Sequence, residues 1–283
     1  MRQDKTIIRA GRFVVEVKSP LKSVISGIDQ LYGKSTADFC DFHIEIQPRR
    51  LVKRQAIFSF NGIKPFSPLP FAHAFPLLEW GLNWCVTQNC HQYLLIHAAV
   101  VEKNGQVIIM PGSPGAGKST LCAALVTAGG WTLFSDELAL IDPITGQVLA
   151  NPRPVSLKNK SIDIIQNLAP NATFSPFVSD TIKGTVAHMK PEGLNFNDFD
   201  LEQSGKAAYI IFPKFQMDKQ TQLCKVSVGN AFIRMAENSF NYHVLGQKGF
   251  SALSLLMEQV KCYDYLYDGD LDRAMVFFDE LVS

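Results

Sequence analysis

The sequence has few charged residues, almost no net charge and no long apolar run. Asp, Glu, Lys and Arg make up 19% of the 283 residues, and the formal net charge is +1. A chain so balanced has no strong field to attract nucleic acid or an anionic membrane, so we expect neither as a partner. No run of about 18 apolar residues occurs, so we expect no transmembrane helix. The N-terminus also lacks the apolar segment of a secretory signal.

Cysteine is present, but not in a spacing that indicates a metal site. Six Cys occur, and none forms a Cys-x-x-Cys pair. Cys85 and Cys90, followed by His91, have no second ligand pair at the spacing of a zinc site. We therefore expect buried free thiols, and reduced thiols without a signal predict a cytoplasmic protein.

The chain is rich in apolar residues. They make up 47% of it and include 20 Phe, which is enough for a sizeable core in one large domain or two small ones. One basic stretch, formed by Arg49, Arg50, Lys53 and Arg54, is interpreted as a solvated loop and strand face rather than a binding patch.

Hydrophobic patterning predicts a small β-rich N-terminal region followed by a larger α/β domain. Before residue 93 the expected elements are strands within 6–18, 39–46 and 55–60, a proline-rich loop at 62–71 and a helix at 74–90. Beyond it we expect strands at 93–101, 106–110, 131–135, 138–142, 184–187, 207–212, 222–228 and 262–267. Helices are expected at 118–128, 159–168, 229–238, 250–261 and 271–282, and loops at 169–181 and 191–205. The strands outnumber the crossover helices, so we expect a mixed sheet.

One motif carries strong chemical meaning. Residues 112–119 read Gly-Ser-Pro-Gly-Ala-Gly-Lys-Ser, which fits Gly-x-x-x-x-Gly-Lys-[Ser/Thr] at every required position, between a predicted strand and helix. In such a loop, backbone N–H groups and the helix N-terminus face phosphate oxygens. The Lys118 ammonium reaches the β- and γ-phosphates, and the Ser119 hydroxyl coordinates Mg²⁺. We therefore expect ATP and Mg²⁺ at this loop, bound by Gly112, Ser113, Pro114, Gly115, Ala116, Gly117, Lys118, Ser119 and Thr120.

An acidic pair follows the predicted strand after this helix. Asp136 and Glu137 stand where a carboxylate can hold Mg²⁺ or accept a proton from an attacking hydroxyl, although a solvated strand end is the simpler alternative. The predicted magnesium ligands are Ser119, Asp136 and Glu137. His97 lies in an apolar strand, where a histidine is more often a core residue than a functional one.

These segments together resemble a known kinase family. Residues 97–100, 112–120 and 135–137 resemble the catalytic domain of bacterial HPr kinase/phosphorylase. Residues 151–159, 183–188, 211–214, 245–250 and 263–278 resemble more closely the branch called HprK-related kinase A. The resemblance to this branch spans most of the chain, whereas the resemblance to HPr kinase itself is confined to about residues 93–142.

The resemblance implies a fold and roles for several residues. It implies a mixed-sheet P-loop kinase domain of the HPr kinase/phosphoenolpyruvate carboxykinase type at 73–283, after a small α+β region at 1–72. Asp136 matches the general base that acts on the acceptor hydroxyl, and His97 matches a histidine near the acidic pair. Glu137 replaces an Asp, and the Glu-Ile-Arg-Gly signature of HPr kinase is absent, so HPr as substrate and the phosphorylase reaction stay open.

Phosphoryl transfer needs positive charge beyond Mg²⁺ and the loop lysine. The basic candidates are Arg153, Lys158, Lys183, His188 and Lys190, and for each a surface position is the alternative. The resemblance favours Arg153, Lys183 and His188. The predicted catalytic residues are thus Asp136, His97, Lys118, Arg153, Lys183 and His188.

The predicted activity is transfer of the γ-phosphoryl group of ATP to a hydroxyl, with a Ser of a partner protein or peptide as the expected acceptor. A kinase acting on a small hydroxylated metabolite is the first alternative, and a non-catalytic nucleotide-sensing module is the second. A closed pocket beside Asp136, instead of an open groove, would favour the metabolite. Relatives of HPr kinase assemble into oligomers, so a homo-oligomer is also expected.

Overall fold

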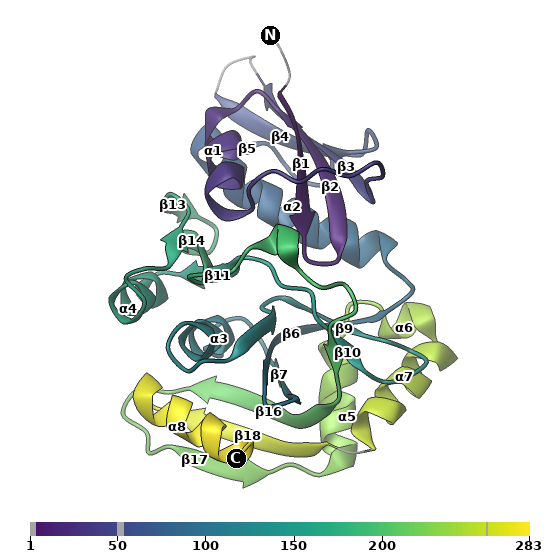
Figure 1. The fold of residues 1–283 in the computed structure, drawn as a ribbon, viewed down its shortest axis with the longest axis vertical. Helices are drawn as coiled ribbons and strands as arrows, with labels where there is room; N and C mark the ends of the chain where they lie inside the picture. Colours follow the sequence, from purple (N-terminus) through teal and green to yellow (C-terminus); the bar gives the residue numbers. More distant parts are fainter. Residues whose placement is uncertain (1–3, 50–53, 259) are drawn as a thin grey trace.

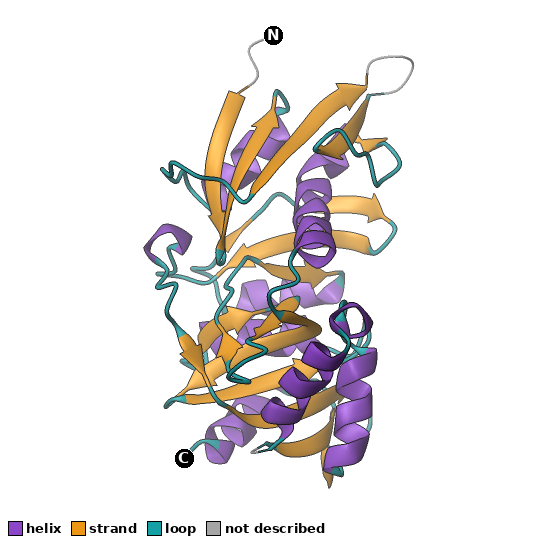
Figure 2. Cartoon of the chain, turned by 90° about the vertical axis from the view of Figure 1, so that its right-hand side faces the viewer, coloured by secondary structure: helices purple, strands orange, loops and turns teal. Residues whose placement is uncertain are grey.

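A computed structural model describes residues 4–49, 54–258 and 260–283, so Arg50 and Lys53 of the basic stretch lie outside the described residues. Figures 1 and 2 show an N-terminal unit and a larger unit stacked along the long axis of a mixed α/β protein. Among the described residues, no helix is both long and apolar enough to cross a membrane.

The N-terminal unit is a five-stranded sheet backed by two helices. Its strands, in spatial order, are β1 (Asp4–Ala10), β2 (Phe13–Ser19), β3 (Phe42–Arg49), β4 (Gln55–Phe60) and β5 (Leu69–Pro70). Its helices are α1 (Lys22–Leu31), the 3₁₀ turn η1 (Phe71–His73) and α2 (Ala74–Asn89). Helix α1 was not predicted, although its buried residues Val24, Ile28 and Leu31 follow the helical period.

Helix α2 belongs by packing to the N-terminal unit. Phe75, Leu78 and Leu82 lie in one buried cluster with Ile8 and Phe58 of the N-terminal sheet. The predicted boundary at residue 72 therefore precedes the boundary seen in packing, which falls after α2. The sequence did not show this, because α2 is apolar on nearly all sides and fits a core on either side of it.

The larger sheet joins strands of both directions, which confirms the expected mixed sheet. Its spatial order is β15 (Ser204–Gly205), β10 (Val148–Leu149), β9 (Leu138–Ile141), β6 (Leu94–Lys103), β7 (Gln106–Pro111), β16 (Ala207–Phe215), β18 (Lys261–Tyr267) and β17 (Gln222–Lys225), with β8 (Thr132–Ser135) beside β9 on β6. Strands β7, β16 and β18 run parallel, and the other neighbours are antiparallel. The carboxyl ends of these three parallel strands consequently meet at one edge.

Both faces of this sheet are buried beneath helices. Alternate residues of β6 point to opposite faces, so that Val101 packs in a cluster with α3 (Lys118–Thr127) and α8 (Leu271–Leu281). Its neighbour Val100 packs with α5 (Val228–Glu237) and α7 (Gln247–Met257). Burial on both faces explains why the sequence shows near-continuous apolar runs here rather than alternation.

A third, smaller sheet lies between the two units (Figure 1). It contains β11 (Val155–Lys158), β14 (Gly184–Lys190), β12 (Thr173–Phe174) and β13 (Val178–Thr181), and α4 (Lys160–Leu168) packs beside it. The prediction of a loop over 169–181 was wrong, because β12 and β13 both pair with β14. The predicted loop at 191–205 holds the short η2 (Phe196–Asp198), and α6 (Tyr242–Leu245) was also not predicted.

Candidate functional site

The glycine-rich loop leaves the carboxyl end of β7 and leads directly into α3. Gly115 and Gly117 have φ values of +88° and +89°, in the left-handed region that favours glycine. Two strands hold the loop from outside: the Phe215 N–H donates to the Ala116 carbonyl at 3.1 Å, and the Tyr267 hydroxyl donates to the Gly117 carbonyl at 3.1 Å. The loop is thus fixed to the carboxyl ends of β16 and β18.

Lys118 folds back over this loop. Its ammonium donates to the carbonyls of Gly112 at 2.6 Å and Ser113 at 3.1 Å, and the residue is only 6% exposed. Burial lowers the pKa of Lys118, and the nearby carboxylates of Asp136 and Glu137 oppose this shift. A buried ammonium inside a curled backbone is the kind of place where an anion binds.

Asp136 follows directly on β8 and is 3% exposed. Its Oδ2 accepts the Ser156 N–H at 2.9 Å, and Ser119 of α3 lies near the same carboxyl group, where it acts to lower the pKa of Asp136. Its Oδ1 is buried and has no hydrogen-bond partner among the described residues. Burial, followed by the charge of Glu137, raises the pKa of Asp136 to about 6. A carboxylate with one free oxygen and this pKa is suited to accept a proton near neutral pH.

Glu137 has the opposite environment. Its Oε2 lies 3.3 Å from His97 Nε2 of β6, and its Oε1 lies 4.0 Å from Lys158 Nζ of β11. Burial acts to raise the pKa of Glu137, but the hydrogen bond from His97 and the charges of Lys158 and Lys183 outweigh it and hold the pKa at about 2. Glu137 therefore remains a carboxylate while its neighbour can exchange a proton.

A narrow polar cleft opens beside the acidic pair. The free volume inside it is about 30 Å³, the room of one or two water molecules, so the cleft is narrow in this structure. Asp136, Glu137, Asn151 and Ser156 line it from the larger unit, and Glu79, Trp80 and Asn83 line it from α2. Arg153, Lys183 and His188 also line it, so the three basic residues favoured from the sequence all reach this cleft.

Arg153 is tied to the N-terminal unit. One Nη donates to Glu79 Oε2 at 2.7 Å and the other donates to the side chain of Asn83, while the Tyr32 hydroxyl donates to the same Glu79 carboxylate at 2.8 Å. Burial alone would lower the pKa of Arg153, but Tyr32 and Glu79 oppose it and raise the pKa above its usual range. Its Nε is buried and has no hydrogen-bond partner among residues 4–49, 54–258 and 260–283, so one donor stays unused beside the cleft.

Lys183 and His188 reach the cleft from the third sheet. Lys183, in the turn between β13 and β14, places its ammonium 5.4 Å from the centre of the Trp80 ring. His188 is buried edge-on against Phe75, and its Nδ1 has no partner among the described residues. Burial lowers the pKa of His188, which favours the neutral ring.

The structure brings most predicted site residues together and adds others that the sequence did not single out. Lys118, Ser119 and Asp136 form one group, and His97 joins through Glu137. The additional cleft residues are Glu79, Trp80, Asn83, Ser135, Leu138, Asn151, Pro154 and Ser156. The sequence does indicate one of them, Glu79. It is the only charged residue in the apolar helix α2, and a buried charge of this kind requires a partner of opposite charge.

The predicted magnesium ligands fit a hard cation in part. Ser119 lies near the Asp136 carboxyl group, and the Asp136 Oδ1 has no hydrogen-bond partner within the described part of the chain. Glu137, in contrast, faces His97 and Lys158. Within the described part of the chain, no group of three or more His, Cys, Asp or Glu side chains converges as a metal site would require. Magnesium beside phosphates takes most of its ligands from water and phosphate oxygens, so two protein oxygens suit it.

Comparison with known proteins gives one partial match. The model of a family described as SynChlorMet cassette protein ScmC matches residues 81–163. This stretch runs from α2 into α4, so the similarity includes the P-loop, Asp136, Glu137 and Arg153, but neither Lys183 nor His188. Among curated proteins, no match was found.

Proposed function

We propose that the chain is an ATP- and Mg²⁺-dependent phosphotransferase with a fold of the HPr kinase/phosphoenolpyruvate carboxykinase type. The observation that carries this proposal is the position of Asp136, between Ser119 of the P-loop and the polar cleft. Its free, buried Oδ1 and its pKa of about 6 support the role of a general base. A P-loop without such a base would support nucleotide binding alone.

The proposed reaction moves the γ-phosphoryl group to a hydroxyl in the cleft. The loop N–H groups and the Lys118 ammonium bind the phosphates, with Lys118 exchanging its carbonyl partners for phosphate oxygens. The acceptor hydroxyl gives its proton to Asp136 and forms a bond to the γ-phosphorus, while the bond to the β-phosphate oxygen breaks and ADP leaves. Mg²⁺, when bound, would neutralise charge on the phosphates; Ser119 and, through water, Asp136 are the residues that would hold it, so that the Asp136 carboxylate stays free to accept the proton.

Cationic groups of the cleft stabilise the charge of the transferred group in this proposal. Lys183 is the most available of them, because the Arg153 guanidinium already bonds to Glu79 and Asn83. His97 acts through Glu137, whose charge it holds in place. Glu137 in turn raises the pKa of Asp136 and keeps that base suited to neutral pH.

The acceptor we propose is a Ser hydroxyl of a partner protein or peptide. The narrowness of the cleft and its cover by α2 also favour a second candidate, a small hydroxylated metabolite, because a narrow, covered site favours a small acceptor over an extended polypeptide. A non-catalytic nucleotide-sensing module would have no use for a buried carboxylate with a free oxygen.

The test is transfer from γ-labelled ATP to candidate peptides, proteins and pooled hydroxylated metabolites. Asp136→Asn is expected to lower transfer by at least about a hundredfold, the scale of a lost general base, while ADP still binds. Asp163→Asn, on the exposed side of α4, is the matched control and should transfer as wild type does. If Asp136→Asn transfers phosphate at the wild-type rate, the assigned base is wrong. Saturable nucleotide binding without transfer to any acceptor would favour the sensing module.

A further inference from the structure

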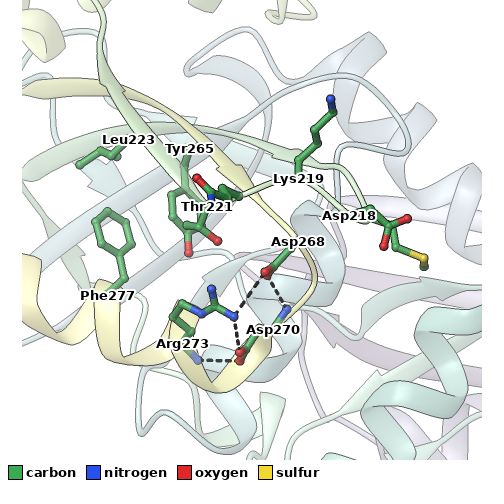
Figure 3. Close-up of a pocket in the computed structure, with 11 residues that line it drawn as sticks. Asp218, Lys219, Thr221, Leu223, Tyr265, Asp268, Asp270, Arg273 and Phe277 are labelled. Carbon is green, nitrogen blue, oxygen red and sulfur yellow. Dashed lines mark hydrogen bonds and ion pairs between the residues drawn. The ribbon is translucent and has the colours of Figure 1, made fainter.

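A second pocket lies at the carboxyl edge of the parallel strands, away from the acidic pair (Figure 3). It is formed by the segment after β16, the start of β17, the end of β18 and the first turns of α8. We call it the edge pocket, and the lining residues that matter here are Leu223, Tyr265, Asp268, Arg273 and Phe277. It is wide and open to solvent, unlike the cleft beside Asp136.

The edge pocket adjoins the P-loop through the strands that hold this loop. Phe215, which ends β16, bonds to Ala116 of the loop, and Tyr267, which ends β18, bonds to Gly117. The pocket begins within a few residues of both anchors, with Met217 and Asp268. Two strand spacings of about 4.8 Å separate β7 from β18, so the pocket starts roughly 10 Å to the side of the loop.

The direction of a bound nucleotide follows from the order of the strands. Asp136 follows β8, which pairs with β6 on one side of β7, whereas β16 and β18 lie on the other side. If the γ-phosphate faces Asp136, the chain of phosphates runs across the loop and the nucleoside extends toward β16 and β18. The edge pocket lies on this side of the loop, beyond the ends of β16 and β18.

We infer that the edge pocket binds the nucleoside part of the nucleotide, so that the enzyme distinguishes a nucleotide from inorganic pyrophosphate. This inference rests on the proposed function. Two side chains present apolar surface for a base: Leu223, which is 42% exposed, and the half-buried Phe277. The Phe277 ring stacks on the Tyr265 ring, with 4.6 Å between the ring centres. The planar guanidinium of Arg273 offers a second surface for stacking.

The polar side of the edge pocket suits a ribose. The Arg273 guanidinium lies 3.3 Å from Asp268 Oδ2 and 2.7 Å from Asp270 Oδ2, and Figure 3 shows these three side chains together. Carboxylate oxygens held in place by such a contact can accept hydrogen bonds from neighbouring hydroxyls. Asp270 is also the N-terminal cap of α8, since its Oδ1 accepts the Arg273 N–H at 2.9 Å. Asp268 is therefore the better residue to alter.

The experiment compares the affinities of ADP and inorganic pyrophosphate, both with Mg²⁺, by calorimetry. Leu223→Glu, Arg273→Ala and Asp268→Asn should each weaken ADP binding, by about tenfold or more for Leu223→Glu, and leave pyrophosphate binding within about twofold of wild type. The matched control is Ile144→Glu, the same kind of change at a residue 84% exposed in the turn after β9. It should change neither affinity.

Each outcome separates this inference from the proposed function. Weaker ADP binding with unchanged pyrophosphate binding supports the nucleoside site. If wild type binds pyrophosphate as tightly as ADP, or the three variants bind ADP as wild type does, the inference is overturned while the phosphate site stands. If wild type binds neither ligand, or Lys118→Ala leaves both affinities unchanged, the proposed function fails and the inference fails with it.

Discussion

Two neighbouring carboxylates, Asp136 and Glu137, carry opposite pKa shifts. The first has a pKa raised to about 6 by burial, and the second has a pKa lowered to about 2 because His97 and two lysines outweigh burial. The two shifts are linked, because the charge that Glu137 retains is one cause of the raised pKa of Asp136. Residues with environments that separate their pKa values in this way often divide acid and base roles between them.

The raised pKa of Asp136 predicts how transfer depends on pH. In the proposed reaction the base, Asp136, must be ionised, so the transfer rate should rise with pH through about 6 and level off above it. Glu137→Gln removes a charge that raises this pKa, so the rise should move to lower pH. Rates measured between about pH 5 and 8, with saturating ATP, test both statements. A flat profile, or a shift of the Glu137→Gln profile to higher pH, would contradict the assignment.

The same shifts predict opposite effects on stability. An acid with a raised pKa in the folded state stabilises the fold at low pH, and this contribution is lost as the pH rises through about 6. Asp136→Asn should therefore increase the free energy of unfolding at pH 7, by about 1–3 kcal/mol. The gain should shrink as the pH falls from about 6 toward 3.8, the ordinary value for Asp.

Glu137 provides the comparison. Its lowered pKa contributes stability above the ordinary value of 4.5, and this is lost as the pH falls through about 2. Glu137→Gln should therefore lower the free energy of unfolding at pH 7. Urea denaturation of both variants measures whether each substitution raises or lowers the free energy of unfolding. Destabilisation by Asp136→Asn would show that the Asp136 carboxylate makes stronger stabilising interactions than its unpartnered Oδ1 indicates.

At the scale of elements, the P-loop depends on the strands that hold it. A Cβ at Gly117 would overlap the hydroxyl of Tyr267, whereas a Cβ at Gly115 would meet nothing within 4 Å. Both glycines have nearly the same positive φ, so substitution by Ala should cost the same backbone strain at either position, about 1 kcal/mol. A comparison of the two variants therefore separates the effect of backbone strain, which both share, from the effect of steric overlap, which occurs only at Gly117.

This pair gives a matched test of the loop. Gly115→Ala should weaken ADP binding slightly, and Gly117→Ala should weaken it much further, because the loop must leave β18. Tyr267→Phe removes the overlapping oxygen, so Gly117→Ala combined with Tyr267→Phe should regain part of the affinity. Equal losses for the two glycine variants, measured by ADP titration, would show that the anchor to β18 does not shape the loop.

The elements also show which parts of the fold could be predicted from the sequence and which could not. The strand before the P-loop and the helix after it were predicted within one residue at their ends, because a strong motif and two-sided burial agree there. Strands β12 and β13 were missed, because they are short and owe their structure to pairing with β14 rather than to their own residues. The acidic pair could be predicted from its place after a strand, but the Glu79–Arg153 contact could not, since only folding joins α2 to this segment.

At the scale of the whole molecule, the two units share one site. The core of the larger unit carries the P-loop and the acidic pair, while α2 of the N-terminal unit covers the cleft. A buried network joins them: Arg153 bonds to Glu79 at 2.7 Å, and Tyr32 bonds to the same carboxylate. The N-terminal unit thus contributes directly to the lining of the cleft.

This network predicts a large and specific loss of stability. Arg153→Met leaves the Glu79 carboxylate buried without its cation, and removal of one member of a buried ion pair typically costs about 3–5 kcal/mol. Glu79→Gln combined with Arg153→Met removes both charges, so it should be more stable than Arg153→Met alone. Arg273→Met is the control, because Arg273 lies at the same 2.7 Å from Asp270 but on the surface, where the loss should be small. Urea unfolding of these variants measures the coupling. If Arg153→Met and Arg273→Met lose equally little, the network does not hold α2 over the cleft, and the acceptor side of the site must be held by apolar packing alone.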